Sequence, residues 1–258
     1  MTDAQFSGRV ALVTGASSGI GRATAVLFAE RGARVMAVAR SAERLAHLAA
    51  DTPGVEPLAI SLDTPEACSR AIEETRDRLG PVAILVNNAG RAGYLDRSIW
   101  EQSTEGWRAT MAVNLDAPFE LTRFAVRDMR ELGWGRIVMV SSTAGQLGAP
   151  AMSAYCASKH GLIGLMRSVA QDVGSFGATC NAVLPGWVRT EMAEHDAEQE
   201  SVERGVAVEE IWSERAASYP AGRVLTPEEI ARVIAFLASE DASGVNGEAV
   251  TVALGSVW

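Results

Sequence analysis

The chain has 258 residues, 48% of them hydrophobic, so it is long enough to bury a sizeable core. Its 32 acidic and 23 basic side chains leave a net charge of -9, which opposes nucleic-acid phosphates and anionic membrane surfaces. We therefore expect neither a nucleic-acid nor a membrane partner.

The N-terminal segment has no basic stretch before an apolar core, and no apolar run approaches the ~20 residues that cross a bilayer. Cys68, Cys156 and Cys180 are widely spaced and form no CxxC pair, which argues against a disulfide framework and a zinc site. We expect a soluble protein of the reducing cytoplasm with no bound metal.

Short β-rich runs alternate with longer helical patterns along the chain. Seven strands are predicted, in chain order, at "RVALVTG", "ARVMAVA", "VEPLAIS", "VAILVNN", "GRIVMVSS", "ATCNAVLPG" and "GEAVTVA". Helices are expected between them at 16–31, 41–50, 65–79, 100–132, 153–176 and 226–239. Apolar strands covered on both faces by crossover helices form a doubly wound parallel sheet, so the fold class is α/β, in one domain over residues 1–258.

One connection is unusually long. Residues 190–225 are highly charged and carry two glycines and a proline. Connections of that length are usually lids or binding loops, and we expect a substrate lid here. The alternative is a solvated helical excursion with no role.

The first strand runs into "TGASSGIG", which places Gly15, Gly19 and Gly21 where strand becomes helix. Glycines there let the backbone approach a pyrophosphate, whose charge is met by the amides of the helix start. Ser17, Ser18 and Ile20 belong to the same turn. The spacing differs from GxGxxG and is a weak signal alone, but its place after the first strand predicts a dinucleotide site.

The second strand ends at Ala39 and Arg40, where NAD binders carry an acidic residue for the ribose hydroxyls. With no carboxylate to repel a 2'-phosphate, and with Arg40 and Ser17 available to bind it, NADP(H) is favoured over NAD(H). The alternative is an ordinary surface arginine.

Two further strand ends belong to the predicted cofactor site. Leu62 and Asp63 follow the third strand, where Asp63 either accepts a bond from the adenine amino group or caps the next helix. Asn88, Ala89 and Gly90 follow the fourth strand, where Asn88 either supports the cofactor or pins the neighbouring strand.

Tyr155 and Lys159 share one helix face at positions i and i+4, and the fifth strand ends in Ser141 and Ser142. An unperturbed tyrosine is about three pKa units too weak an acid for proton transfer at neutral pH, which corresponds to roughly 4 kcal/mol. A lysine cation ~4 Å away at an effective dielectric near ~20 supplies about that much, so we expect Lys159 to lower the pKa of Tyr155. Ser142 can donate to the substrate oxygen, while Ser141 points to the other face of the strand.

With TGASSGIG, NNAG, Ser142, Tyr155 and Lys159 together, the sequence resembles the short-chain dehydrogenase/reductase family over essentially its whole length. The resemblance implies a Rossmann fold, an NADP(H)-dependent alcohol or ketone oxidoreductase and a homotetramer. It makes Tyr155 the general acid or base, with Lys159 also on the nicotinamide ribose, and makes Asn114 the residue that holds a water for proton relay. It places Pro185, Gly186, Val188 and Thr190 beside the nicotinamide, and it suggests that Trp258 packs at a subunit contact.

The chain is similar to both 3-oxoacyl-(acyl-carrier-protein) reductases and polyketide ketoreductases, but two features oppose an acidic carrier. Gly133 and Phe176 stand where the resemblance would put carrier-docking arginines, and residues 191–214 hold nine acids and one arginine. We therefore expect a small, largely apolar alcohol or ketone, with a 3-oxoacyl or polyketide ketone as the alternative.

A cofactor sensor without chemistry is disfavoured, because all four catalytic residues are present. Apolar pocket walls are expected from Ala92, Tyr94, Ala144, Trp187, Met192 and Trp212, each of which is equally consistent with core or lid packing.

Overall fold

The computed structural model describes residues 4–92 and 98–256. Tyr94 and Trp258, the first expected in a pocket wall and the second at a subunit contact, lie outside these residues. Among the described helices, none combines the length and the apolar character needed to span a bilayer.

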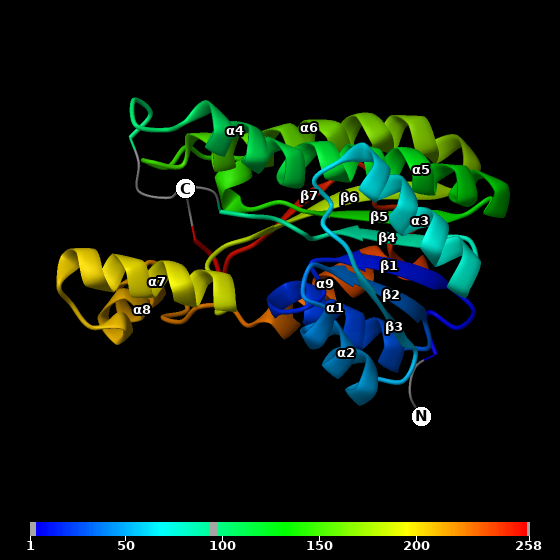
Figure 1. Cartoon of the computed structure of the whole chain (residues 1–258), viewed down its shortest axis with the longest axis horizontal. Coiled ribbons are helices and arrows are strands. Elements are labelled where there is room, and N and C mark those ends of the chain that lie inside the picture. The colour runs from blue at the N-terminus through cyan, green and yellow to red at the C-terminus, as the bar shows by residue number, and fades with distance from the viewer. Residues whose placement is uncertain (1–3, 93–97, 257–258) are drawn as a thin grey trace.

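The centre of the protein is a parallel seven-stranded sheet (Figure 1). Its strands are β1 (Val10–Thr14), β2 (Arg34–Ala39), β3 (Val55–Ala59), β4 (Ile84–Asn87), β5 (Gly135–Val140), β6 (Ala178–Pro185) and β7 (Ala249–Val252). Their order is β3-β2-β1-β4-β5-β6-β7 and every neighbouring pair is parallel. The predicted α/β class and seven-stranded sheet are confirmed. The strand order reverses between β1 and β4, and ligands of such sheets bind beyond the carboxyl ends of the strands at that point.

Helices cover both faces of the sheet. They are α1 (Gly19–Glu30), α2 (Ala42–Asp51), α3 (Pro65–Leu79), α4 (Thr104–Met111), α5 (Ala117–Leu132), α6 (Ser153–Val173), α7 (Glu191–Arg204), α8 (Val208–Ala217) and α9 (Pro227–Leu237). In Figure 1, α1, α2 and α9 lie on one side of the sheet and α3, α5 and α6 on the other. A single helix was expected over 100–132, but one π-helical turn, Ala112–Asp116, separates α4 from α5.

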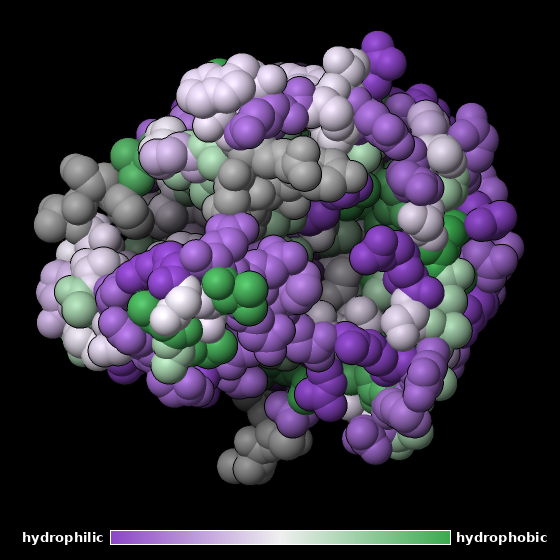
Figure 2. All heavy atoms as spheres, turned by 60° about the vertical axis from the view of Figure 1, so that its left-hand side comes forward, coloured by the Kyte–Doolittle hydropathy of each residue, from purple (hydrophilic) through white to green (hydrophobic). Residues whose placement is uncertain are grey.

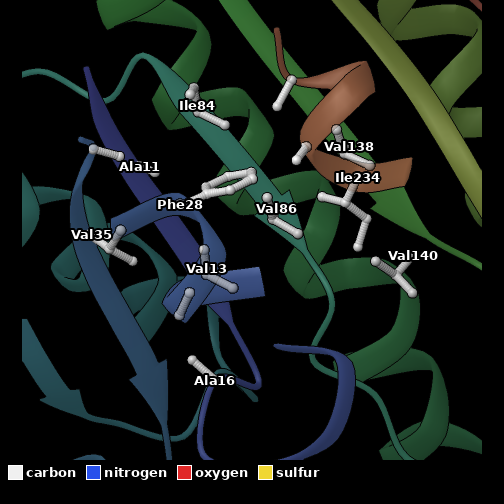
Figure 3. Packing of buried hydrophobic residues seen from close by; sticks show 14 of the residues in the cluster. Ala11, Val13, Ala16, Phe28, Val35, Ile84, Val86, Val138, Val140 and Ile234 are labelled. Carbon is white, nitrogen blue, oxygen red and sulfur yellow. The ribbon is translucent and has the colours of Figure 1, made fainter. Parts of the chain in front are cut away.

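Alternation along the strands produces two cores. Ala11 and Val13 of β1 face α1 and α9, where they pack with Phe28 and Ile234 (Figure 3). Val10 and Leu12 of the same strand belong to the opposite core, formed with α3, α5 and α6. Because side chains alternate along a strand, residues buried on both faces make these strands apolar throughout, which is the pattern that the sequence carried.

The long connection is a pair of helices, α7 and α8, that stands apart from the sheet (Figure 1). It has a small core of its own, with Ala197, Ile211 and Trp212 buried between the two helices. We call α7, α8 and their flanking turns, residues 190–225, the lid segment.

Candidate active site

The glycine loop joins β1 to α1. Gly15 has a φ of 68°, a left-handed conformation that favours glycine. Gly21 has ordinary helical dihedrals, but a Cβ there would collide with the Gly15 carbonyl oxygen and the Asn88 side-chain amide. Ser18 precedes α1 without a side-chain capping bond, so the first amides of α1 remain available to an anion. The loop therefore fits a dinucleotide pyrophosphate, and two of its glycines are also required by packing within the protein.

Asn88 holds the end of β4 against the end of β1. Its side-chain amide donates to the Thr14 carbonyl oxygen at 2.8 Å. The Thr14 hydroxyl in turn accepts from the backbone amides of Asn88 and Ala89, both at 2.9 Å. Of the two roles considered for Asn88, these contacts support the second, in which Asn88 holds the neighbouring strand in place. Thr14 was missed from the sequence, although its place directly before the first loop glycine was the available signal.

The expected adenosine end of the site lies at β2 and β3. Arg40 is exposed directly after β2, and Leu62 is buried. Asp63 is exposed, and the capping role considered for it belongs to its neighbour Thr64, whose hydroxyl accepts from the Ala67 amide at 3.2 Å. Thr64 caps α3 because a threonine directly before Pro65 has the extended backbone that this position requires.

Ser141 and Ser142 end β5 and contact α6 in different ways. The Ser141 hydroxyl donates to the Lys159 carbonyl oxygen at 3.1 Å, which fixes the helix to the strand. The Ser142 hydroxyl accepts from the Ala144 amide at 3.1 Å and forms a side-chain hydrogen bond with Tyr155. The structure therefore brings Ser142 and Tyr155 together as the sequence predicted, and assigns Ser141 a structural contact.

Lys159 is buried beside Tyr155. Its ammonium group donates to the Val140 carbonyl oxygen at 2.8 Å and lies 5.6 Å from the centroid of the Tyr155 ring. Burial lowers the pKa of Lys159 to about 8. Gly90 adjoins this group, since a Cβ on it would lie 3.6 Å from the Lys159 nitrogen and 3.5 Å from Asn114 Oδ1.

The pKa of Tyr155 differs in direction from the sequence expectation. Burial raises it, Asp196 of α7 raises it further by charge, and the hydrogen bond from Ser142 opposes both. Lys159 is not among the groups that shift this pKa, and its ammonium group donates instead to the Val140 carbonyl oxygen. In this structure Tyr155 is therefore a protonated phenol at neutral pH.

Asn114 lies fully buried in the π-helical turn. Its Oδ1 accepts from the Arg91 amide at 2.9 Å, and its Nδ2 donates to the Arg91 carbonyl and the Ser158 hydroxyl, both at 3.0 Å. Ser158 also donates to the Tyr155 carbonyl oxygen at 2.7 Å. Asn114 thus links the segment after β4 to the helix of Tyr155, through the widened turn that π-helices often provide at functional sites.

The segment after β6 passes beside the glycine loop. Pro185 ends β6, and Val188 pairs with Leu225 in an isolated bridge. Thr190 caps α7, and its methyl carbon would lie 3.1 Å from a Cβ on Gly19. This contact places the start of the lid segment directly over the loop that fits the pyrophosphate.

Gly186 is constrained by Tyr219, a residue that was not predicted. The Tyr219 hydroxyl accepts from the Trp187 amide at 2.5 Å and occupies the space that a side chain on Gly186 would need. Tyr219 is 4% exposed. It therefore fixes the segment that the family resemblance places beside the nicotinamide.

The expected pocket walls divide into two groups. Trp187 and Met192 are partly exposed, at 38% and 46%, while Ala92 and Ala144 are half-buried. Trp212, in contrast, is only 5% exposed and packs inside the lid segment, where its indole donates to Glu194. Because Trp212 is buried inside the lid segment, it packs within that segment and does not form a pocket wall, which is the second of the two roles that the sequence left open.

Arg215 holds the lid segment together from inside. It is 8% exposed, donates to the Ala193 carbonyl oxygen at 3.1 Å and pairs with Glu200 at 2.9 Å. Its guanidinium lies 3.9 Å from the centroid of the Trp187 ring. Figure 2 turns the lid side forward and shows a mostly hydrophilic surface with a small hydrophobic patch.

Comparison with known proteins extends over nearly the whole chain. A family model described as enoyl-(acyl carrier protein) reductase matches residues 15–256. The 3-oxoacyl-[acyl-carrier-protein] reductase FabG of Vibrio cholerae is 38% identical over 249 residues, covering 96% of each chain. The monensin polyketide synthase putative ketoacyl reductase of Streptomyces virginiae is 37% identical over 254 residues, covering 96% of this chain and 97% of the relative.

Two solved structures have the same fold. A variant of the actinorhodin polyketide ketoreductase, crystallised with NADPH, has a TM-score of 0.91 at 34% identity and covers 97% of each chain. Levodione reductase has a TM-score of 0.91 at 32% identity and covers 96% of each chain.

Proposed function

The chain belongs to the short-chain dehydrogenase/reductase family, and we propose that it is an NADP(H)-dependent ketoreductase that interconverts a ketone and a secondary alcohol. The observation that carries this proposal is the Tyr155 hydroxyl, hydrogen-bonded to Ser142 and flanked by Lys159 at the carboxyl end of β5. A proton donor, an oxyanion partner and a cation meet there, next to a loop that fits a dinucleotide.

In reduction, Tyr155 donates its proton to the ketone oxygen while Ser142 donates a hydrogen bond to the same oxygen. NADPH supplies the hydride. Tyr155 carries its proton at neutral pH, as a free phenol would, and can therefore act as the acid, although burial raises its pKa and so makes it a weaker one. Lys159 is assigned to the nicotinamide ribose, and Asn114 and Ser158 connect the turn of Tyr155 to the segment after β4, along which a water is proposed to return the proton.

The cofactor contacts follow the strand ends. We assign the pyrophosphate to the loop of Gly15, Ser17, Ser18, Gly19, Ile20 and Gly21, and the adenosine end to Arg40, Leu62 and Asp63. The nicotinamide end is assigned to Ala89, Gly90, Tyr155, Lys159, Pro185, Gly186, Val188 and Thr190, with Asn88 supporting the loop. Arg40 supports NADP(H) because an exposed guanidinium at the end of β2 is suited to a 2'-phosphate.

Two classes of ketone compete as substrate. A 3-oxoacyl or polyketide ketone, the alternative from the sequence, is the first candidate, because the relatives that share 37 to 38% identity are named for such reactions. A small, largely apolar ketone without a carrier is the second. It is favoured by the nine acids and one arginine of residues 191–214, which repel an acidic carrier, and by the resemblance to levodione reductase.

The test is a spectrophotometric assay of NADPH and NADH consumption with four substrates. These are acetoacetyl carrier protein, acetoacetyl coenzyme A, a neutral acetoacetyl thioester and a cyclic diketone. A higher kcat/KM for the thioesters than for the diketone supports the first candidate, and the reverse order supports the second. If none of the four consumes either cofactor, the ketoreductase proposal is wrong.

We further propose, from the family resemblance, that the protein is a cytoplasmic homotetramer and that the lid segment closes over the ketone. Light scattering during gel filtration tests the assembly, with four chain masses as the expected result. A monomer would contradict it without affecting the proposed chemistry.

A further inference from the structure

The helix that carries Tyr155 begins without the usual stabilising features. Met152 occupies the capping position of α6 and makes no side-chain capping bond. Ala151 before it has a φ of 61°, a left-handed conformation that is unfavourable for a residue with a Cβ. Tyr155 is the third residue of α6 and so belongs to its first turn. The position of its hydroxyl depends on a turn that α6 alone does not hold.

Gln102 bridges this turn from another part of the chain. Its Nε2 donates to the Ala151 carbonyl oxygen at 3.2 Å, and its Oε1 accepts from the Ser153 hydroxyl at 2.6 Å. The two contacts lie on either side of Met152. One amide side chain, from the segment before α4, therefore clamps the left-handed residue and the first helical residue together.

The second turn of α6 is held by different contacts. Lys159 donates to the Val140 carbonyl oxygen, and its own carbonyl accepts from Ser141. Ser158 is bound by Asn114. Loss of the Gln102 contacts would therefore loosen the turn of Tyr155 while Lys159 stays attached to β5.

We propose that Gln102 is a positioning residue for Tyr155, acting through the two hydrogen bonds that fix the first turn of α6. The role in turnover rests on the proposed ketoreductase function. The effect on the helix start does not, because it concerns contacts within the protein.

The kinetic test uses Gln102→Ala, Ser153→Ala and the double variant. Each single change is expected to lower kcat about tenfold, with the KM for NADPH changed less than twofold, because the glycine loop, Arg40 and Lys159 keep their contacts. Both changes remove the bond between Gln102 and Ser153, so their effects on kcat should not be independent. The fold-loss in kcat of the double variant should be much smaller than the product of the two single fold-losses. Gln5→Ala is the matched control, because Gln5 also bridges two side chains, Arg31 and Asp241, before β1.

Hydrogen exchange gives a readout that needs no activity. In Gln102→Ala, the amide of Cys156, which donates to the Met152 carbonyl oxygen at 2.8 Å, should exchange about tenfold faster, while those of 160–163 should exchange as in the unchanged protein. Unchanged kcat and unchanged exchange would overturn the proposal, as would faster exchange throughout the protein. If the unchanged protein reduces no ketone, the proposed function fails, and the exchange pattern still decides whether Gln102 fixes the turn of Tyr155.

Discussion

The ammonium nitrogen of Lys159 lies 2.8 Å from the carbonyl oxygen of Val140, the last residue of β5. Lys159 is also the only lysine in the chain, since the other 22 of the 23 basic residues are arginines. Arginine keeps its charge when buried, whereas lysine can lose a proton at moderate pH. The one lysine of the chain thus lies in the proposed active site, where a group that can lose a proton at moderate pH is useful for proton transfer.

A single lysine allows a direct titration. In protein labelled with ¹⁵N at the lysine side chain, one resonance should move with a midpoint near the pKa of about 8 that burial gives Lys159. The same resonance in urea should titrate near the ordinary value of 10.5. Equal midpoints in the folded and unfolded protein would contradict the effect of burial.

The lowered pKa of Lys159 also predicts how stability depends on pH. Between about 8 and 10.5 the unfolded chain binds more protons than the folded protein, so the free energy of unfolding rises with pH across this window. Below pH 8 the full cost of about 3 kcal/mol is present. Lys159→Met should therefore be more stable than the unchanged protein by about 2 kcal/mol at pH 7, allowing about 1 kcal/mol for the lost hydrogen bond.

That gain should disappear as the pH approaches 10.5 in urea unfolding curves. If the difference in the free energy of unfolding between Lys159→Met and the unchanged protein is the same at every pH, burying the charge of Lys159 does not destabilise the folded protein. Turnover should be lost at all pH values, since stability and function conflict at this position.

Tyr155→Phe removes the proton donor and keeps the ring. We expect kcat to fall by about 10²- to 10⁴-fold, the usual contribution of general acid catalysis, while NADPH still binds with a Kd within a few-fold of the unchanged protein. Stopped-flow reduction and fluorescence titration measure the two quantities. Substantial residual turnover with bound NADPH would show that another group donates the proton.

Arg40→Ala tests the cofactor preference. A charge-assisted hydrogen bond contributes about 1.5 to 3 kcal/mol, so kcat/KM with NADPH should fall roughly 10- to 100-fold while the value with NADH changes little. Arg40→Asp should go further and favour NADH, because the carboxylate repels a 2'-phosphate and accepts from the ribose hydroxyls. An unchanged protein that already prefers NADH would refute the assignment of Arg40.

Gly21→Ala places a Cβ against the Gly15 carbonyl oxygen and the Asn88 amide. We expect a loss of stability of about 1 to 3 kcal/mol and a much higher Kd for NADPH, because the glycine loop must move.

Gly164→Ala in α6 is the matched control. A Cβ at Gly164 meets nothing within 4 Å, so this helical substitution should stabilise the protein by up to about 1 kcal/mol. Similar melting temperatures for the two variants would contradict the packing argument.

The sequence determined the fold class and most of the candidate site. Its β-rich runs and helical periods predicted the seven strands, because apolar patterning is a local property. The pairing of Tyr155 with Lys159 followed from helical spacing, and the place of Ser142 followed from the end of β5. Lys159 is also the one lysine of the sequence, which singles out the same position independently.

Only the tertiary structure decided how these groups are held and charged. Thr14, Tyr219 and Gln102 act through contacts between residues far apart in the chain, which no local pattern encodes. The pKa of Tyr155 is raised rather than lowered, because it depends on burial and on Asp196 from the lid segment as well as on its sequence neighbour. Sequence spacing fixes which side chains share a helix face, while burial and the remaining partners of each group arise only when distant segments pack together.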